Sequence, residues 1–507
     1  MGGFLFPSDA VIFPVRIGVE RDRVRCRPQR IDPTMVGVVA DRHKMGVEMG
    51  KRKRDNVCGR RSRAGLSRAL PLSSEGGNMD LKMKLTDEQL GILNGERGET
   101  AAKVMKTLVL FGEVFGAEKL VPVTHAQGHL VTSFGIGLLK PLFRTMDELI
   151  AAGLKAEGGL TVDPRPVDYE NVKCNLLEKL VFDKFMYSEQ ARYEEQLMKV
   201  GLRDADAFSC TCYLPEAGNI PGKGDILSWA ESSAVVYANS VLGARCNRNS
   251  GMLDLFGSVV GYVPYFGLLT DEGRRATWKV VVKTSKLPEA QVLGSAIGMK
   301  VVEDVPYVFG LDKFLGGELT DDVKAYLKDF GAATASNGTV GLYHIDGLTP
   351  EAKEQGEALI TADAKTYVID DAELERVYRS YPVMWKDPAA KAKLCFIGCP
   401  HLTYSQLVGW TKAIRGALAD AGRRKVAVRT VLCAAPGVVK RFKATQQYAE
   451  LTATGATLTS ICPLMYTNNP LTKSKTIATN SNKLRTYSVA RYYKDADILR
   501  VIAGEGK

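Results

Sequence analysis

Residues 392–422, AKLCFIGCPHLTYSQLVGWTKAIRGALADAG, decide the fold class of this chain. They begin with a short apolar run that is typical of a buried strand, continue through a short loop, and end in a helical pattern. Three later segments again present a strand that runs into a loop: KVAVRTVLCAAP (425–436), ATLTSICPLMY (456–466) and KTIATNSN (475–482). Strands that alternate with helical patterns favour an α/β architecture.

The same alternation extends toward the N-terminus. The stretch after Met79 begins a helix, with Thr86 and Gln89 at the spacing of a capping box. Further helical patterns then alternate with short apolar segments along the rest of the chain. We therefore predict a folded module that starts at Met79 and contains two or more α/β subdomains, at about 79–290 and 291–507.

The composition is that of an ordinary globular protein. The 507 residues are 45% hydrophobic and 25% charged, which excludes fibrous and disordered classes. The formal net charge is +11, but residues 1–78 contain 16 Lys and Arg against 8 Asp and Glu. That segment carries +8 and leaves only +3 for the other 429 residues, so we expect no nucleic-acid partner for the main body.

Residues 1–78 have three competing interpretations: a disordered basic arm, a targeting segment, or translated sequence upstream of a start at Met79, which we favour. Their apolar beginning is interrupted by Pro7, Asp9 and Pro14, so we expect neither a signal peptide nor a membrane span. From Met79 onward no run reaches the roughly 18 apolar residues of a membrane helix. We therefore expect a cytoplasmic protein whose ten cysteines are reduced.

Three cysteines lie in short turn-like segments: Cys210 in FSCTCY, Cys399 in IGCPHL and Cys462 in SICPLM. Cys399 and Cys462 follow predicted strands, and in open α/β sheets the loops after strands converge on one crevice. We therefore predict that the three thiolates hold one metal centre. Taken singly, a free cysteine is more often a small buried apolar side chain than a ligand.

Other cysteines leave alternatives open. Cys395, Cys399 and the nearby His401 are spaced like half of a structural zinc site, although no second pair completes it. Cys212 would point to the same face as Cys210 if this segment is an extended strand. The doublet alone therefore does not decide which of the two thiols is a ligand.

Residues 229–248 predict a helix of small residues that carries many polar groups: Glu231, Ser232, Asn239, Ser240, Arg245, Asn247 and Arg248. So many polar groups on one helix indicate more than a solvated face. Arg245 and Arg248 could hold a carboxylate or a phosphate through paired N–H donors. The plainer alternative is a structural ion pair with Glu231.

Two loops complete the candidate site. THAQGH carries His125 and His129 at a spacing that suits a ligand pair on a helix, but its glycine favours a substrate-binding loop, with a structural histidine as the plainer alternative. In ATNSNK, Ser481 follows Asn480 and precedes Lys483 by two residues. No GxSxG elbow surrounds this serine, so it is interpreted either as a base stabilised by Lys483 or as a helix cap.

In this order, THAQG (124–128), FSCTCYLPEAGN (208–219), WAESSAVVYANSVLGAR (229–245), IGCPH (397–401), ICP (461–463) and ATNSNK (478–483) resemble the large, catalytic subunit of the aconitase X family. The resemblance covers the chain from Met79 to its C-terminus. It implies aconitase-like layered α/β/α domains around a metal-site cleft, an iron or iron–sulfur centre, and a hydro-lyase acting on a small hydroxy acid. Family members also need a small swivelling domain; this chain has no room for it, so a separate small subunit is implied.

The resemblance also assigns individual residues. It places the metal ligands at Cys210, Cys399 and Cys462, the base at Ser481, and electrostatic support at Lys483. It assigns substrate binding to His125, Gln127, Gly128, Glu231, Ser232, Asn239, Ser240, Arg245, Arg248 and Asn480. The sequence departs from the family pattern at two positions, which bear on cluster type and substrate: Cys212, where Pro is usual, and Cys246, where Thr is usual.

The substrate stays open at this point. We rank cis-3-hydroxy-L-proline, converted to pyrroline-2-carboxylate, ahead of mevalonate 5-phosphate. An alternative of another class is a non-catalytic subunit whose cysteines bind structural zinc or only pack. Replacing Ser481 by Ala would leave such a protein unchanged, whereas it would remove the turnover of a hydro-lyase.

Overall fold

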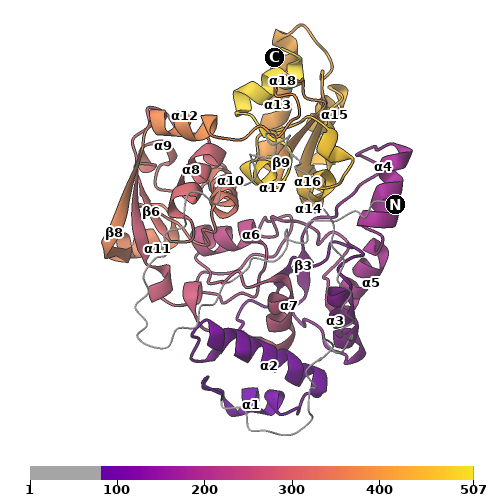
Figure 1. Cartoon of the computed structure of the whole chain (residues 1–507). Coiled ribbons are helices and arrows are strands. Elements are labelled where there is room, and N and C mark those ends of the chain that lie inside the picture. Colours follow the sequence, from indigo (N-terminus) through magenta and orange to yellow (C-terminus); the bar gives the residue numbers. More distant parts are fainter. Residues whose placement is uncertain (1–80, 506–507) are drawn as a thin grey trace, which may run out of the picture. The chain divides into compact units, whose positions relative to one another are not determined.

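The strand predicted in residues 392–422 is β9 (Leu394–Leu402), which is buried along its whole length. The other elements of this C-terminal part are β10 (Arg429–Ala434), β11 (Thr457–Thr459), β12 (Ile477–Thr479), β13 (Arg491–Tyr492), α13 (Tyr404–Asp420), α14 (Pro436–Lys443), α15 (Gln446–Ala453), α16 (Pro463–Thr467), η7 (Thr472–Ser474), α17 (Asn482–Tyr487) and α18 (Asp495–Ala503). The strands form one parallel sheet in the order β11-β10-β9-β12-β13. In the computed structural model, which describes residues 81–505 except the Lys473 side chain, helices surround this sheet (Figure 1).

A second parallel sheet precedes it in the chain. Its part of the fold contains β5 (Ala276–Val282), α8 (Ala290–Val301), β6 (Pro306–Phe309), α9 (Asp312–Leu315), α10 (Asp321–Asn337), β7 (His344–Ile345), α11 (Pro350–Gln355), η6 (Gly356–Leu359), β8 (Ile360–Ile369) and α12 (Asp371–Arg379). The strand order is β7-β6-β5-β8. Two parallel sheets covered by helices confirm the predicted α/β class.

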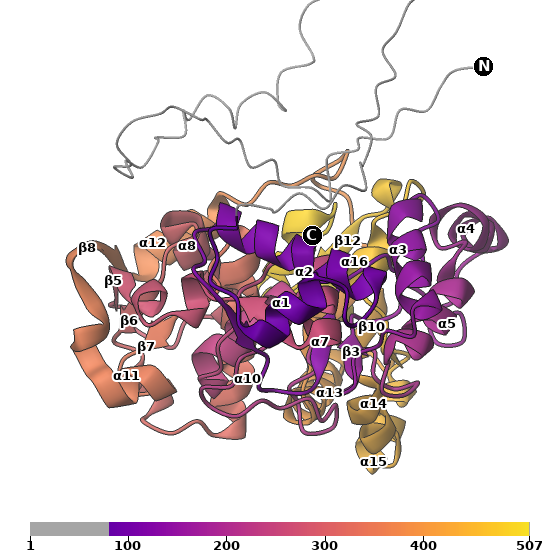
Figure 2. The ribbon, with the colours of Figure 1, turned by 90° about the horizontal axis from the view of Figure 1, so that it is seen from below.

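Helices dominate the N-terminal part. Its elements are α1 (Asp87–Leu93), α2 (Glu99–Val114), β1 (Leu120–Pro122), β2 (Gly128–Leu130), α3 (Lys140–Ala151), β3 (Leu160–Val162), α4 (Leu176–Val181), η2 (Phe182–Met186), α5 (Gln190–Val200), α6 (Ser232–Tyr237), η3 (Ala238–Leu242), α7 (Gly251–Val260), β4 (Tyr262–Pro264), η4 (Gly267–Leu269) and η5 (Glu272–Arg274). Thr86 and Gln89 form the predicted capping box at the start of α1. Seen from below, α1 and α2 lie next to each other (Figure 2).

The sheet topology positions three of the predicted site residues. Cys399 lies near the carboxyl end of β9, Cys462 follows β11, and Ser481 follows β12. Because these strands are parallel members of one sheet, their carboxyl ends meet at the same edge. Side chains that are far apart in the sequence therefore lie at the same edge of the sheet.

Cys399 differs in its local structure from the prediction of a loop, because β9 continues past it to Leu402. Gly398 has a φ of +100°, a conformation that glycine adopts readily. A Cβ at this position would lie 2.3 Å from the carbonyl oxygen of Cys433. The strand is therefore irregular at Cys399, and glycine is what permits it.

Within residues 207–214, for which the sequence left a turn-like and an extended segment open, residues 210–213 form turns and Leu214 forms a bend. Only Phe208 makes a strand-like bridge, to Val162 of β3. The condition under which Cys210 and Cys212 would share one face, an extended backbone, is therefore not met, and the segment at Cys210 is turn-like as predicted. Cys212 is fully buried, whereas Cys210 is partly exposed.

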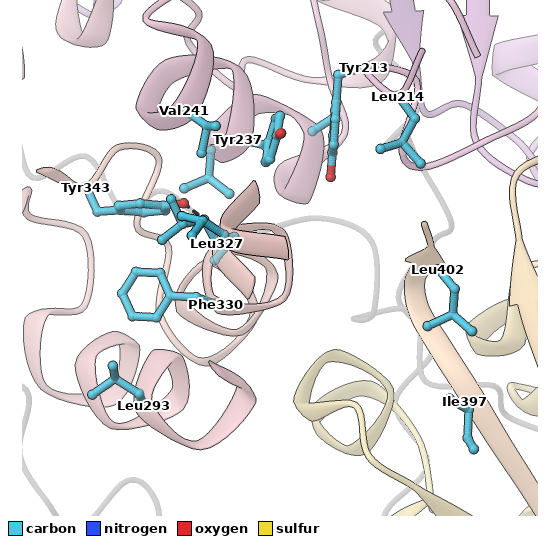
Figure 3. Packing of buried hydrophobic residues seen from close by; sticks show 14 of the residues in the cluster. Tyr213, Leu214, Tyr237, Val241, Leu293, Leu327, Phe330, Tyr343, Ile397 and Leu402 are labelled. Atoms are coloured by element: carbon cyan, nitrogen blue, oxygen red, sulfur yellow. Dashed lines mark hydrogen bonds between the residues drawn. The ribbon is translucent and has the colours of Figure 1, made fainter. Parts of the chain in front are cut away.

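One hydrophobic cluster connects the two parallel sheets. It contains Val280 of β5, Ile397 of β9 and Leu432 of β10, together with side chains of α6 and α10. Figure 3 shows part of it, with the rings of Tyr213 and Tyr237 side by side. The two sheets therefore share one core.

Residues 1–80 and 506–507 lie outside the described part of the chain, and the three interpretations of the N-terminal segment fall there. The described residues belong to one compact unit, and a subdomain boundary near residue 290 stays a prediction. Among the helices within residues 81–505, none combines the length and the apolar character needed to traverse a membrane.

Candidate active site

Three cysteines gather at the carboxyl edge of the five-stranded sheet. The Sγ of Cys210 accepts a hydrogen bond from the backbone N–H of His401 at 3.5 Å. Burial raises the pKa of Cys462, and the neighbouring Cys399 raises it further. Burial also raises the pKa of Cys210, with a smaller contribution from Cys399. The three thiols therefore lie within electrostatic reach of one another.

Ser481 is the N-cap of α17 and lies beside Cys399. Its Oγ accepts the backbone N–H of Leu484 at 3.1 Å and donates to the carbonyl oxygen of Cys399. Burial raises the pKa of the Cys399 thiol, while Lys483 and a hydrogen bond from Ser481 oppose the rise. The interpretation of Ser481 as a helix cap is confirmed. As the cap, its hydroxyl also lies beside Cys399.

Lys483 forms a buried ion pair with Glu231, the N-cap of α6. The Glu231 carboxylate also accepts the backbone N–H of Ala234 at 2.7 Å and the hydroxyl of Ser233 at 2.6 Å. Burial alone would raise the pKa of Glu231, but Lys483 lowers it. Burial alone would lower the pKa of Lys483, but Glu231 and Cys399 raise it well above its usual range. A fixed cation therefore stands next to the thiols.

The structure adds Asp163, which the sequence reasoning did not consider, and places it beside His129 of the THAQGH segment. Asp163 follows β3 and His129 lies in β2, and their Oδ1 and Nε2 atoms are 3.7 Å apart. Both atoms are buried and have no hydrogen-bond partner among the described residues. Burial lowers the pKa of His129 to about 4, while burial and Glu231 raise the pKa of Asp163. An aspartate directly after an apolar strand, as in LTVDP, was the available signal.

The predicted substrate loop lies between β1 and β2. His125 Nε2 is 2.7 Å from the side-chain oxygen of Asn219. The side-chain NH₂ of Asn219 donates to the carbonyl oxygen of Gly128 at 3.1 Å. The carbonyl of Gln127 accepts the indole N–H of Trp229 at 2.9 Å. These contacts fix the loop in place. The prediction of a loop here, and not of a helix with paired histidines, is confirmed.

Three predicted substrate residues make contacts within the chain. Asn239 accepts a backbone N–H at 2.9 Å, and Ser240 accepts another at 2.9 Å. Arg245 donates to a backbone carbonyl at 2.8 Å and pairs with Asp271. The expected helix changes to a π-helix at Ala238, which redirects the residues that follow. These polar groups already have partners within the chain, and their role in substrate binding stays a prediction.

The remaining predicted substrate residues have different surroundings. Ser232 is half-buried in the first turn of α6, directly after Glu231. Arg248 is half-buried, and within residues 81–505 it makes neither an ion pair nor a hydrogen bond. Asn480 donates to Asp495 at 2.9 Å. Ser232 and Arg248 therefore stay predicted substrate contacts, while Asn480 already has a partner.

The other cysteines considered from the sequence are packing residues. Cys212, Cys246 and Cys395 are fully buried in the largest hydrophobic cluster, whereas Cys399 belongs to a different one. The ring of His401 is bound to a backbone carbonyl at 3.0 Å. Cys395, Cys399 and His401 therefore do not form the zinc site that their spacing suggested.

The donor set at the sheet edge fits an iron–sulfur cluster in its chemistry, because thiolates are the protein ligands of such clusters. No three Cys, His, Asp or Glu side chains within residues 81–505 converge as the ligands of a single ion would. Cluster ligands bind different iron atoms, so they need to converge less closely than the ligands of one ion. Cys210, Cys399 and Cys462 thus suit a cluster better than a mononuclear site, and their role as ligands stays a prediction.

Comparisons with known proteins identify the family of the chain. Family models for the first, second and third domains of aconitase X match residues 82–272, 276–379 and 392–500. A crystal structure of Thermococcus kodakaraensis aconitase X in its holo-form superimposes with a TM-score of 0.67 and 28% identity. The match covers 83% of this chain and 99% of that one.

Two curated relatives have activity names. The phosphomevalonate dehydratase large subunit of Thermococcus kodakarensis is 35% identical, over 64% of this chain and 75% of the relative. The cis-3-hydroxy-L-proline dehydratase of Hypocrea jecorina is 28% identical, over 81% of this chain and 66% of the relative. The chain belongs to the aconitase X family and is a dehydratase, that is, a hydro-lyase.

Proposed function

We propose that the chain is the catalytic subunit of an iron-dependent dehydratase that removes water from cis-3-hydroxy-L-proline. The observation that carries the proposal is the position of Ser481, whose hydroxyl contacts the Cys399 carbonyl and lies near the cation of Lys483. A hydroxyl, a fixed cation and thiols at one buried edge supply the base, the charge and the metal ligands that an elimination needs.

Cys210, Cys399 and Cys462 would hold an iron–sulfur cluster, which supplies a Lewis-acidic iron for the leaving hydroxyl when bound. The Oγ of Ser481, as its alkoxide, takes the proton from the carbon next to the substrate carboxylate. The C–H and C–O bonds break, a carbon–carbon double bond forms, and the proton and hydroxide leave as one water. Lys483 stabilises the negative charge on Oγ, and the N–H of Leu484 does the same at 3.1 Å.

The choice of substrate rests on Asp163, His129 and Glu231. Two of their buried polar atoms, Asp163 Oδ1 and His129 Nε2, have no partner among the described residues, and such atoms need one. The ring nitrogen of hydroxyproline is a secondary ammonium with two N–H donors, so it can satisfy both atoms. A phosphate would instead place further negative charge beside the carboxyl groups of Asp163 and Glu231, which is unfavourable in a buried site.

A second candidate is the dehydration of mevalonate 5-phosphate. It is favoured by the higher identity to the Thermococcus relative, 35% against 28% for the Hypocrea relative. Arg248, which is half-buried, would be the group to pair with the phosphate.

We also infer a small subunit on a separate chain. The archaeal relatives are named large subunits, a name that implies a small partner. The match to the Hypocrea relative covers 66% of that protein, so a third of its length has no counterpart in the matched region. The complete enzyme would then form when this chain binds its small subunit.

Replacing Asp163 by Asn tests the substrate assignment. With cis-3-hydroxy-L-proline we expect KM to rise roughly 10- to 100-fold, because a hydrogen bond to the charged ring nitrogen is lost. The matched control is Asp206→Asn, since Asp206 is exposed and should leave KM unchanged. The measurement is steady-state dehydration by the complex with its small subunit, with the two candidate substrates in competition.

The outcomes separate the two substrates. Turnover of cis-3-hydroxy-L-proline with the expected rise in KM supports the proposal. If the complex turns over only mevalonate 5-phosphate, and Asp163→Asn leaves its KM unchanged or lowers it, the second candidate is the substrate. Turnover of neither substrate by a complex that contains its metal would contradict both.

A further inference from the structure

A buried network of hydrogen bonds connects β2 with β3 next to the candidate active site. Thr161 of β3 lies opposite His129 of β2, because the two strands pair in parallel with these residues in register. Thr161, His129 and Asn219 are all buried, and buried polar groups normally find their partners within the protein. The hydrogen bonds of this network can therefore be assigned one by one.

The hydroxyl of Thr161 has three polar neighbours. Its Oγ1 lies 2.9 Å from Nδ1 of His129, 2.8 Å from Nδ2 of Asn219 and 3.2 Å from the carbonyl oxygen of Gly128. A hydroxyl group has one proton to donate and two lone pairs that accept. All three contacts can therefore be hydrogen bonds only if the hydroxyl donates in one of them and accepts in the other two.

Two of the three neighbours have fixed roles. The carbonyl oxygen of Gly128 can only accept, and it also receives the side-chain NH₂ of Asn219 at 3.1 Å. This contact orients the Asn219 amide, because the reverse orientation would bring two carbonyl oxygens together. The same NH₂ group faces Thr161, so it donates to Oγ1.

The third neighbour, His129, must then donate to Thr161. Thr161 gives its proton to Gly128 and accepts from Asn219, so its second lone pair is left for an N–H at Nδ1 of His129. If Thr161 gave its proton to Nδ1 instead, its contact with the Gly128 carbonyl would contain no proton. Burial lowers the pKa of His129 to about 4, so the ring is neutral at neutral pH and has one N–H. Nε2 therefore carries a lone pair.

We propose that Thr161 is a positioning residue that holds His129 as the tautomer with Nδ1–H, and that it thereby selects a substrate with N–H donors. The lone pair of Nε2 faces Asp163 Oδ1 across 3.7 Å, so a ligand with two N–H groups can bond to both atoms. An ionised phosphate or carboxylate has no proton to give to Nε2. For the substrate, this inference rests on the proposed dehydration of cis-3-hydroxy-L-proline, whereas the tautomer follows from the network alone.

Nitrogen-15 NMR of the full chain, labelled at histidine and purified without oxygen, identifies the protonated ring nitrogen of His129. Nε2 lies next to both ring C–H groups and Nδ1 next to one, and the signals that disappear in His129→Gln are those of His129. We expect Nδ1–H in the unchanged chain and in Thr161→Ser, which keeps the hydroxyl. In Thr161→Val we expect the proton at Nε2, where Asp163 can accept it. Thr107→Val is the matched control, because Thr107 is exposed on α2.

Steady-state dehydration by the complex with its small subunit measures the effect on the substrate. Thr161→Val should raise KM for cis-3-hydroxy-L-proline roughly tenfold, and Thr161→Ser should restore it. We expect a smaller change in kcat, because Ser481 and the predicted ligand cysteines remain. A residue that only supports the fold would lower the stability of Thr161→Val without moving the proton of His129.

The outcomes test the tautomer and the substrate separately. A proton at Nε2 in the unchanged chain, or at Nδ1 in folded Thr161→Val, would overturn the proposal. A tautomer that changes while KM does not would overturn the role of Thr161 in substrate selection. If the tautomer changes as expected but the complex turns over neither candidate substrate, the proposed dehydration fails and the tautomer assignment stands. The unchanged chain decides the tautomer even if Thr161→Val does not fold.

Discussion

Replacing Ser481 by Ala is expected to lower kcat for dehydration by about 10²- to 10⁴-fold, the usual contribution of a positioned general base. Lys483 should not take over this role, because Glu231 holds it as a cation. The metal content should be unchanged, because all three predicted ligand cysteines remain in the Ser481→Ala chain. Turnover by the complex and iron content measured on the same sample check this result.

Some loss of stability accompanies this change and has to be separated from the loss of turnover. Ser481 caps α17, and loss of such a cap costs about 1 kcal/mol. Ser488→Ala is the matched control, because Ser488 closes the same helix and donates to the backbone carbonyl of Leu484 at 2.6 Å. Turnover close to that of the unchanged enzyme in a folded, iron-containing Ser481→Ala chain would mean that another group is the base.

Replacing Lys483 by Met should produce the largest change in stability. The Glu231 side chain is 3% exposed and that of Lys483 is 13% exposed, so the change leaves a buried carboxylate without its counter-ion. Breaking a buried ion pair in this way typically lowers the free energy of unfolding by about 3–5 kcal/mol. Urea denaturation followed by circular dichroism measures it, and turnover should be lost at the same time.

Two further variants identify the cause of that change. Lys494→Met removes an ion pair with Glu375 whose side chains are 33% and 40% exposed, and we expect less than about 1 kcal/mol there. The double variant Lys483→Met, Glu231→Gln should recover part of the stability, because it removes the buried carboxylate as well. A Lys483→Met chain as stable as the Lys494→Met chain would show that Lys483 and Glu231 do not form the buried pair.

The sequence predicts those parts of the fold that local patterns determine. The capping box of Thr86 and Gln89 marks the start of α1 because both partners lie within one helical turn. The strands before Cys462 and Ser481 are recognisable as short apolar runs, and the parallel sheet then brings their ends together. The family resemblance, which depends on the same short motifs, is confirmed by the family models.

The parts that the sequence did not predict depend on contacts between distant residues. Asp163 reaches the site because β3 pairs with β2, and a three-residue strand gives no periodic signal of its own. Arg245 follows the π-helix and pairs with Asp271, a partner that the sequence did not indicate. A π-helical turn inserts one residue into a helix, and no local pattern in residues 229–248 announces it.

The central claim is that Cys210, Cys399 and Cys462 together hold one iron–sulfur cluster. Its most direct test is the iron and acid-labile sulfide content of the chain, purified without oxygen, for the unchanged protein and for each single Cys→Ser variant. Cys174→Ser is the matched control, because Cys174 is a half-buried free cysteine with no predicted role at the site. We expect iron and sulfide in the unchanged and Cys174→Ser chains and a loss of both in each of the three ligand variants. Zinc or no metal in the unchanged chain, or iron that persists in all three ligand variants, would contradict the account.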